Sequence, residues 1–124
     1  MAPYTGTLGA RVIALQPGRA EVQLRDRRRV RNHLRSIHAI ALANLGELAS
    51  GLAMSVAMPP RVRGIPVHIA IAYRKKARGT LTAVGTASPG EVLDEATAEA
   101  VSEIRDREGD VVAIVTVQWQ LQRT

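Results

Sequence analysis

The longest regular pattern of apolar positions in this 124-residue chain runs from about Ser36 to Met58, and two prolines follow it directly. Its apolar residues recur every three or four positions, which is the spacing of one face of an α-helix. They are Ile37, Ala41, Leu45, Leu48, Leu52 and Val56. Most of the remaining positions are also apolar or small. We therefore predict a long helix that the rest of the chain surrounds.

Two runs typical of β-strands precede this helix. They extend from Thr7 to Leu15 and from Gly18 to Leu24, and a Gln-Pro-Gly turn signal separates them. Apolar and polar residues alternate in the second run, so one of its faces should be buried. The pair predicts a hairpin. The basic run from Arg25 to Arg31 that follows is either a solvated surface or a phosphate-binding segment.

The residues after the helix begin with a segment rich in proline and continue with two strand-like runs. Pro59 to Pro66 contains three prolines and a glycine, so we predict a loop. Val67 to Tyr73 is an apolar run that indicates a strand. Thr80 to Ala87 is rich in threonine and small apolar residues, which also favours a strand.

The last part of the chain predicts a second hairpin. Glu95 to Arg105 has the composition of a helix, but its small and polar residues alternate with a period of two. A turn signal at Arg107 to Asp110 leads directly into Val111 to Leu121, which has the clearest strand pattern of the chain. Because a hairpin needs two arms, we predict that Glu95 to Arg105 is a strand. The order is two strands, one helix and four strands.

Composition narrows the possible classes of protein. The length suits a single α+β domain covering residues 1–124. Without cysteine, disulfides and thiolate chemistry are excluded, and a cytoplasmic location is expected. No apolar stretch of membrane-spanning length lacks a proline or a charge, so we expect no membrane association. The net charge of +6 favours anionic partners or reflects a generally arginine-rich surface.

Glu47 is the one formally charged residue inside the predicted helix. A glutamate in apolar surroundings needs a partner or a function, so Glu47 is either a catalytic carboxylate or a structural acid that Asn44, one turn earlier, satisfies. His38 lies nine residues before Glu47, about 13 Å along the helix axis and half a turn out of phase. If both residues serve one reaction, a second chain must supply one of them.

A longer pattern resembles a known family. Asn32, His38, Glu47 and Gly51 have the spacing of the hotdog-fold acyl-CoA thioesterases, and the segment V-H-I-A-I-A-Y-R-K-K-A-R-G that starts at Val67 resembles the same proteins. The similarity is to the branch of the phenylacetate-pathway enzymes and their uncharacterised relatives. It implies a hotdog fold, in which an antiparallel six-stranded sheet wraps one long central helix. It also implies a homodimer, which can pair further into a dimer of dimers, with its sites at the dimer interface.

The resemblance assigns roles to individual residues. Glu47 matches the acid of the family, Asn32 its asparagine, and His38 with Ala39 its His-Gly pair. Glu47 would act as base or nucleophile on the thioester, and the Ala39 N–H at the helix start would stabilise the oxyanion. Asn32 would hold the attacking water or the carbonyl, and His38 would pack the site. This chain departs from the family in having Ala39 and Ile40 where glycines are usual.

A metal site is not expected. His33 and His38 could serve as ligands, but no third histidine or acid follows at ligand spacing. No cofactor is required either, because coenzyme A would enter as part of the substrate. Its phosphates would contact basic side chains near the mouth of the site, and ordinary surface charge is the alternative for all of them. The candidates are Arg61, Arg63, Arg74, Lys75, Lys76 and Arg78.

Three functional hypotheses remain. The leading one is an acyl-CoA thioesterase, and the second is a non-catalytic hotdog protein that binds acyl-CoA or acyl chains. The third, a basic nucleic-acid-binding domain, is disfavoured because the chain has three aromatic residues besides histidine and no phenylalanine for base stacking. The expected partners are therefore an acyl-CoA substrate and a second copy of the chain.

Overall fold

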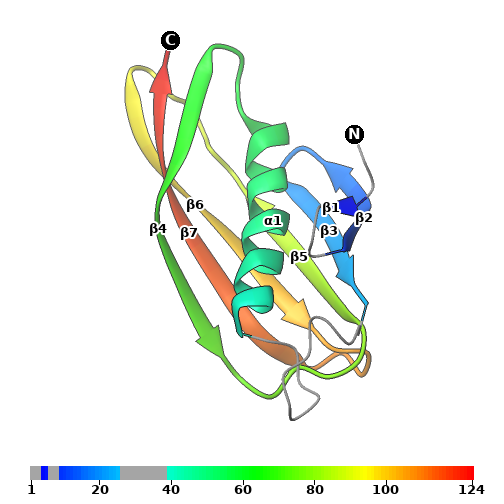
Figure 1. The fold of residues 1–124 in the computed structure, drawn as a ribbon. Helices are drawn as coiled ribbons and strands as arrows, with labels where there is room; N and C mark the ends of the chain where they lie inside the picture. Colours follow the sequence, from blue (N-terminus) through cyan, green and yellow to red (C-terminus); the bar gives the residue numbers. More distant parts are fainter. Residues whose placement is uncertain (1–3, 6–8, 26–38) are drawn as a thin grey trace.

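The computed structural model describes residues 4–5, 9–25 and 39–124. Its elements are β1 (Tyr4–Thr5), β2 (Ala10–Gln16), β3 (Arg19–Leu24), α1 (Ala39–Ala57), β4 (Val62–Tyr73), β5 (Leu81–Ala87), β6 (Glu95–Arg105) and β7 (Val111–Arg123) (Figure 1). All strand pairs are antiparallel, and the order across the sheet is β1-β2-β3-β5-β6-β7-β4. The six predicted strands are present, and the two-residue β1 extends one edge.

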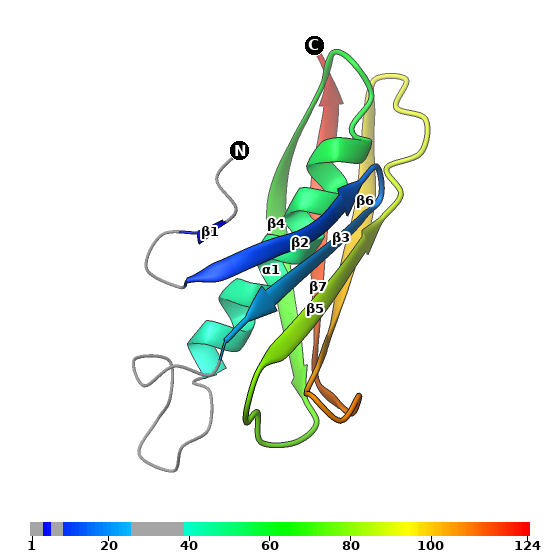
Figure 2. The same cartoon turned by 90° about the vertical axis from the view of Figure 1, so that its right-hand side faces the viewer.

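The sheet is strongly twisted and curves around α1, which lies across its inner face (Figures 1 and 2). The helix contacts β2, β3, β5, β6 and β7. The Gly18 N–H in the β2–β3 turn also donates to the carbonyl of Ala53 over 3.2 Å and so ties the hairpin to the helix. The predicted architecture, a sheet wrapped around one central helix, is confirmed.

The inner face of α1 packs tightly because its residues are small or aliphatic. Its buried residues are Ala41, Leu42, Leu45, Gly46, Ala49, Ser50, Ala53 and Met54. A Cβ on Gly46 would overlap Val115 of β7, and a Cβ on Gly85 of β5 would overlap the Ala49 backbone. Buried Ser102 of β6 donates to the Gly46 carbonyl over 2.6 Å. Helix and sheet therefore approach so closely that no larger side chain fits between them.

By length and composition alone α1 could also cross a membrane. Its buried face, however, belongs to the main hydrophobic cluster of the domain, together with Val22, Leu81 and Ile104 from three strands. These contacts are those of a core helix in a folded domain. The predicted start near Ser36 lies outside the described residues, and the helix ends at Ala57, just before the two prolines that interrupt it.

Two ambiguous segments are resolved as strands. Glu95–Arg105 forms β6, as the turn argument predicted. The predicted loop from Pro59 to Pro66 is wrong beyond Arg61, because β4 already begins at Val62. Pro66 is tolerated there because β4 is an edge strand, where a proline without an N–H interrupts no ladder on the open side. The register also shifts between Pro66 and His68, so Val67 is the extra residue of a β-bulge.

Candidate functional site

Glu47 lies on the flank of α1 that borders strands β4 and β7. It is exposed in the single chain, as is Asn44, so the expected burial of this carboxylate is not found there. Neither side chain makes a hydrogen bond or an ion pair with any other described residue, so the predicted alternative of an Asn44–Glu47 bond is wrong as well. Glu47 thus presents a carboxylate that the described part of the chain does not use.

A hollow of about 430 Å³ opens beside this carboxylate, and we call it the Glu47 hollow. Three elements contribute to it: α1, β4 at its bulge, and β7. Its lining residues are Glu47, Pro66, Val67, His68, Ile69 and Val117. The lining is therefore mostly apolar, with a carboxylate at one side. Such an arrangement can hold an apolar group next to a base or nucleophile.

The strand that borders this hollow, β4, pairs on one side only among the described residues. β4 is the last strand of the sheet and has twelve residues. Large apolar side chains on it are exposed: Ile65 by 63%, Val67 by 57% and Ile69 by 43%. Ile40, on the outer face of α1, is 76% exposed. A long apolar edge with free N–H and C=O groups is a template for pairing with another strand.

Ala39, the expected oxyanion donor, is the first residue of α1. The Tyr73 hydroxyl at the end of β4 donates to the Ala39 carbonyl over 3.4 Å, which holds the helix start against the edge strand. Ala39 and Glu47 are eight residues apart on one straight helix, about 12 Å along its axis. Within one chain they do not meet. Asn32 and His38 lie outside the described residues, as does the basic run from residue 26 onward.

The predicted basic cluster lies at the end of the molecule where α1 starts. Arg74, Lys75, Lys76 and Arg78 are all exposed. Lys75, however, is bound by two aspartates of the β6–β7 turn: its Nζ lies 2.9 Å from Asp106 Oδ2 and 3.1 Å from Asp110 Oδ2. The hydrogen bonds that Lys75 donates to Asp106 and, to a smaller extent, to Asp110 raise the pKa of Lys75 to about 12. In turn, the Lys75 hydrogen bond lowers the pKa of Asp106.

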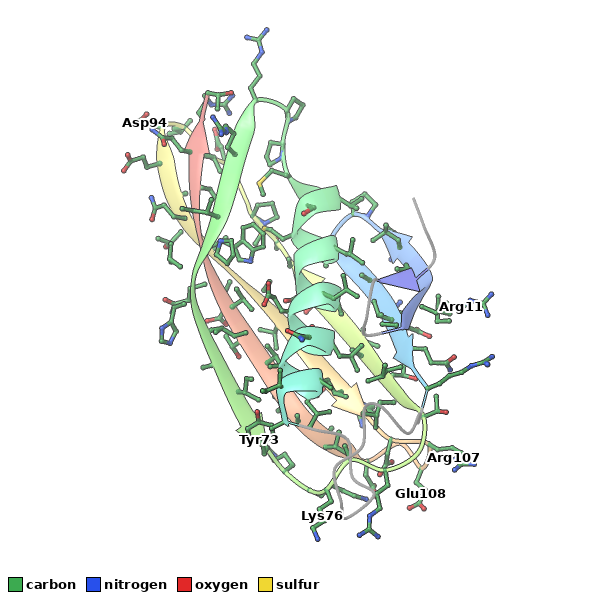
Figure 3. All side chains as sticks on the ribbon, in the orientation of Figure 1. Arg11, Tyr73, Lys76, Asp94, Arg107 and Glu108 are labelled. Atoms are coloured by element: carbon green, nitrogen blue, oxygen red, sulfur yellow. The ribbon has the colours of Figure 1, made fainter. Side chains whose placement is uncertain are left out.

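Sequence reasoning missed one cation at this end. A hollow of about 400 Å³ is lined by Lys75, Lys76, Arg78, Gly79, Asp106, Arg107 and Glu108. Figure 3 shows Arg107 and Glu108 of the β6–β7 turn at the same end as Lys76 and Tyr73. The sequence contained the information needed to find Arg107. This residue lies in the turn of the predicted second hairpin, and such a turn should lie beside the end of a neighbouring strand. Lys75 stays protonated, but the two aspartates balance its charge. The cations of this hollow that remain available to a ligand are Lys76, Arg78 and Arg107.

Arg61 and Arg63, the other predicted contacts for phosphate, lie at the opposite end of β4. Arg63 lines a separate hollow of about 450 Å³ together with Gln120, Arg123 and other residues. At about 3.3 Å per residue, the strand from Arg63 to Arg74 extends roughly 36 Å. The structure therefore divides the predicted basic residues into two separate groups within a chain.

Comparison with known proteins places the chain among solved structures of the same architecture. A genomics-target protein is 27% identical, with 94% of this chain and 79% of that chain covered and a TM-score of 0.86. A protein of unknown function from Pseudomonas aeruginosa, described as a probable thioesterase, is 23% identical, with 94% and 85% covered and a TM-score of 0.83. A mutant of the phenylacetic acid degradation protein PaaI from Thermus thermophilus is 23% identical, with 91% and 93% covered and a TM-score of 0.76.

These likenesses confirm the hotdog fold that the sequence predicts. No curated protein matches the chain. A family model does match, over residues 1–121 and therefore over nearly the whole chain. The chain thus belongs to the family described as a domain of unknown function, DUF4442.

Proposed function

We propose that this protein is a thioesterase that hydrolyses acyl-CoA at a site shared by two chains. The observation that carries the proposal is the Glu47 carboxylate, which has no partner among the described residues, beside an apolar hollow and the edge strand β4. A thioester needs an activated water or a nucleophile at its carbonyl carbon, and a carboxylate can supply either. Solved structures with the same fold that are described as thioesterases support this choice of reaction.

A second copy of the chain completes the site. Two β4 edges related by a two-fold axis would pair antiparallel and cover the exposed apolar residues of both strands. In such a dimer the Ala39 N–H of one chain would face Glu47 of the other chain. The two-fold axis must then pass beside the residue midway between these two positions on α1, which is Ala43. Ile40 and Asn44, near that residue, are both exposed and available for the contact.

In the completed site the roles are divided between the chains. Glu47 of one chain deprotonates a water molecule or attacks the thioester carbonyl directly. The first-turn N–H groups of the other helix, including that of Ala39, stabilise the negative charge that develops on the carbonyl oxygen. Asn32 of that second chain holds the water or the carbonyl, as the family resemblance suggests. The leaving thiolate of coenzyme A is protonated by the base or by water.

The basic end of the molecule binds the phosphates of coenzyme A in this proposal. Lys76, Arg78 and Arg107 surround a hollow at the end where α1 begins. Replacing these three residues with glutamine or methionine should raise KM for an acyl-CoA far more than KM for the matching pantetheine thioester, which lacks the nucleotide phosphates. Lys75→Met serves as the control. An equal effect on both substrates would remove the cluster from the proposal.

The experiment that tests the reaction itself is Glu47→Gln. This substitution keeps the shape of the side chain but removes the base, so release of the coenzyme A thiol should fall by a factor of roughly 10² or more. Ser55→Ala is the matched control, because Ser55 is also exposed on α1 but lies away from the proposed two-fold axis and has no part in the proposed reaction. Undiminished turnover by Glu47→Gln would show that Glu47 is not the catalytic group, whereas binding of acyl-CoA without hydrolysis by the wild type would favour the non-catalytic hypothesis.

A further inference from the structure

Trp119 lies next to the lining residues of the Glu47 hollow, toward the C-terminal end of α1. It pairs with Pro66 across β4 and β7, and Val117 precedes it by two positions on the same face of β7. Pro66 and Val117 both line the hollow. The indole ring is therefore the next side chain that a group would meet if it extended from Glu47 past these residues.

The ring packs between the helix and the edge strand, next to two glycines. A Cβ on Gly51, one turn after Glu47, would lie 3.9 Å from Trp119 Cζ2, and a Cβ on Gly64 of β4 would lie 3.1 Å from Trp119 Cε3. Beyond the ring is an apolar cluster of Val62, Val92 and Leu121, against which Met58 and Trp119 pack. Trp119 also packs against the main core cluster. The indole thus separates the hollow from a second apolar region.

Among the described residues, this tryptophan is held in place by packing. Its Nε1 is buried and has no hydrogen-bond partner among the described residues. A buried N–H without a partner is unfavourable, and a leucine or methionine would fill an apolar slot without that penalty. The bulk and flatness of the ring, rather than its hydrogen-bonding group, are therefore what this position uses.

We propose that Trp119 forms the end wall of the acyl-binding site and restricts the protein to short acyl groups. The inference rests on the proposed function, because it assigns the Glu47 hollow to the acyl group. Trp119 acts by excluding atoms and takes no part in the reaction at the carbonyl. It is a specificity-determining residue, and the substrate class it selects is short-chain acyl-CoA.

The test compares saturated acyl-CoAs from acetyl to dodecanoyl as substrates of wild type and of Trp119→Ala. Wild-type kcat/KM should rise up to a short chain and then fall steeply. In Trp119→Ala the maximum should move to longer chains, with each methylene group that enters the vacated slot raising kcat/KM by about fourfold. Trp119→Phe should give an intermediate profile. Gln118→Ala, an exposed neighbour on the opposite face of β7, should keep the wild-type profile.

The wild type supplies an independent test, since Trp119 is the only tryptophan of the chain. Non-hydrolysable acyl-CoA analogues that reach the ring should shift its fluorescence, whereas coenzyme A alone should not. Affinity measured by calorimetry with the same analogues gives the chain-length profile even for a variant without turnover. Equal binding of hexanoyl and dodecanoyl analogues to wild type would overturn the inference and leave the thioesterase proposal intact. A short-chain binding profile without hydrolysis would keep the inference and refute the thioesterase.

Discussion

The two faces of α1 contain similar residues but have different roles. The inner face carries Gly46 and Ala49, and the sheet approaches them so closely that a single added methyl group would overlap a neighbour. The outer face carries Ile40 and Glu47, both of which are exposed in the single chain. The inner face therefore determines the stability of the domain, whereas the outer face is free to serve assembly and chemistry. Substitution at both faces can test this division.

The largest effect should come from a pair of matched glycine substitutions on the helix. Gly46→Ala, on the inner face, would force the added Cβ into Val115, and we expect the free energy of unfolding to fall by about 2 kcal/mol after the gain in helix propensity is included. Gly51→Ala, on the flank of the helix beside Trp119, places its Cβ at an ordinary 3.9 Å from the nearest indole atom and should raise the free energy of unfolding by up to about 1 kcal/mol. Denaturant unfolding measures both. Equal effects of the two substitutions would refute the division of the helix into two faces.

Cross-linking tests whether the outer face meets a second copy at the predicted level. The chain has no cysteine, so each variant would carry only the introduced one. Asn44→Cys lies next to the proposed two-fold axis, and a short bis-maleimide should join most of the chains into covalent dimers. Ser55→Cys is also exposed on α1, but its copy in the partner should lie roughly 36 Å away along the axis. Efficient cross-linking through Ser55→Cys instead would move the axis away from Ala43.

The smallest effect concerns Lys75, which belongs to neither face of the helix. Because the folded-state pKa of Lys75 is raised to about 12, its contribution to stability is complete below about 10.5 and is lost as pH rises through 12. The pKa of Asp106 is lowered from 3.8, so its contribution is present above that pH and is lost as pH falls through the folded-state value. The melting temperatures of wild type and Lys75→Met should therefore differ modestly near neutral pH and converge at both extremes.

Lys76→Met is the control for this pH dependence, since Lys76 makes no ion pair with any other described residue. Its difference in melting temperature from wild type should not change at low pH. A Lys75→Met difference that stays constant from about pH 2 to about pH 12 would show that the two aspartates do not stabilise the fold through Lys75.

Local pattern was sufficient to predict most of the fold. The period of apolar residues identified α1, and the turn before Val111 decided that Glu95–Arg105 is a strand. The start of β4 was missed, because the proline and glycine content of residues 59–66 indicates a loop unless the strand is known to be an edge. Edge position is a property of the whole sheet, and no local pattern reports it.

The candidate site was less predictable because it depends on contacts between distant segments. Glu47 was identified as the odd charge in an apolar helix, but the sequence did not indicate that it would be exposed in a single chain. The charge of Lys75 is balanced by two aspartates that are more than thirty residues away in the chain. Trp119 fits between two glycines from different elements. Each of these features is tertiary, so composition and spacing could not predict them.

The central claim, a catalytic site made by two chains, is tested most directly by mixing two inactive variants. Glu47→Gln removes the base and Asn32→Ala removes the group expected from the other chain, so each homodimer should be inactive. After subunit exchange, one of the two sites in each mixed dimer contains both wild-type residues. An equimolar mixture should therefore recover about a quarter of the wild-type activity. No recovery in dimers verified to be mixed would contradict the shared site.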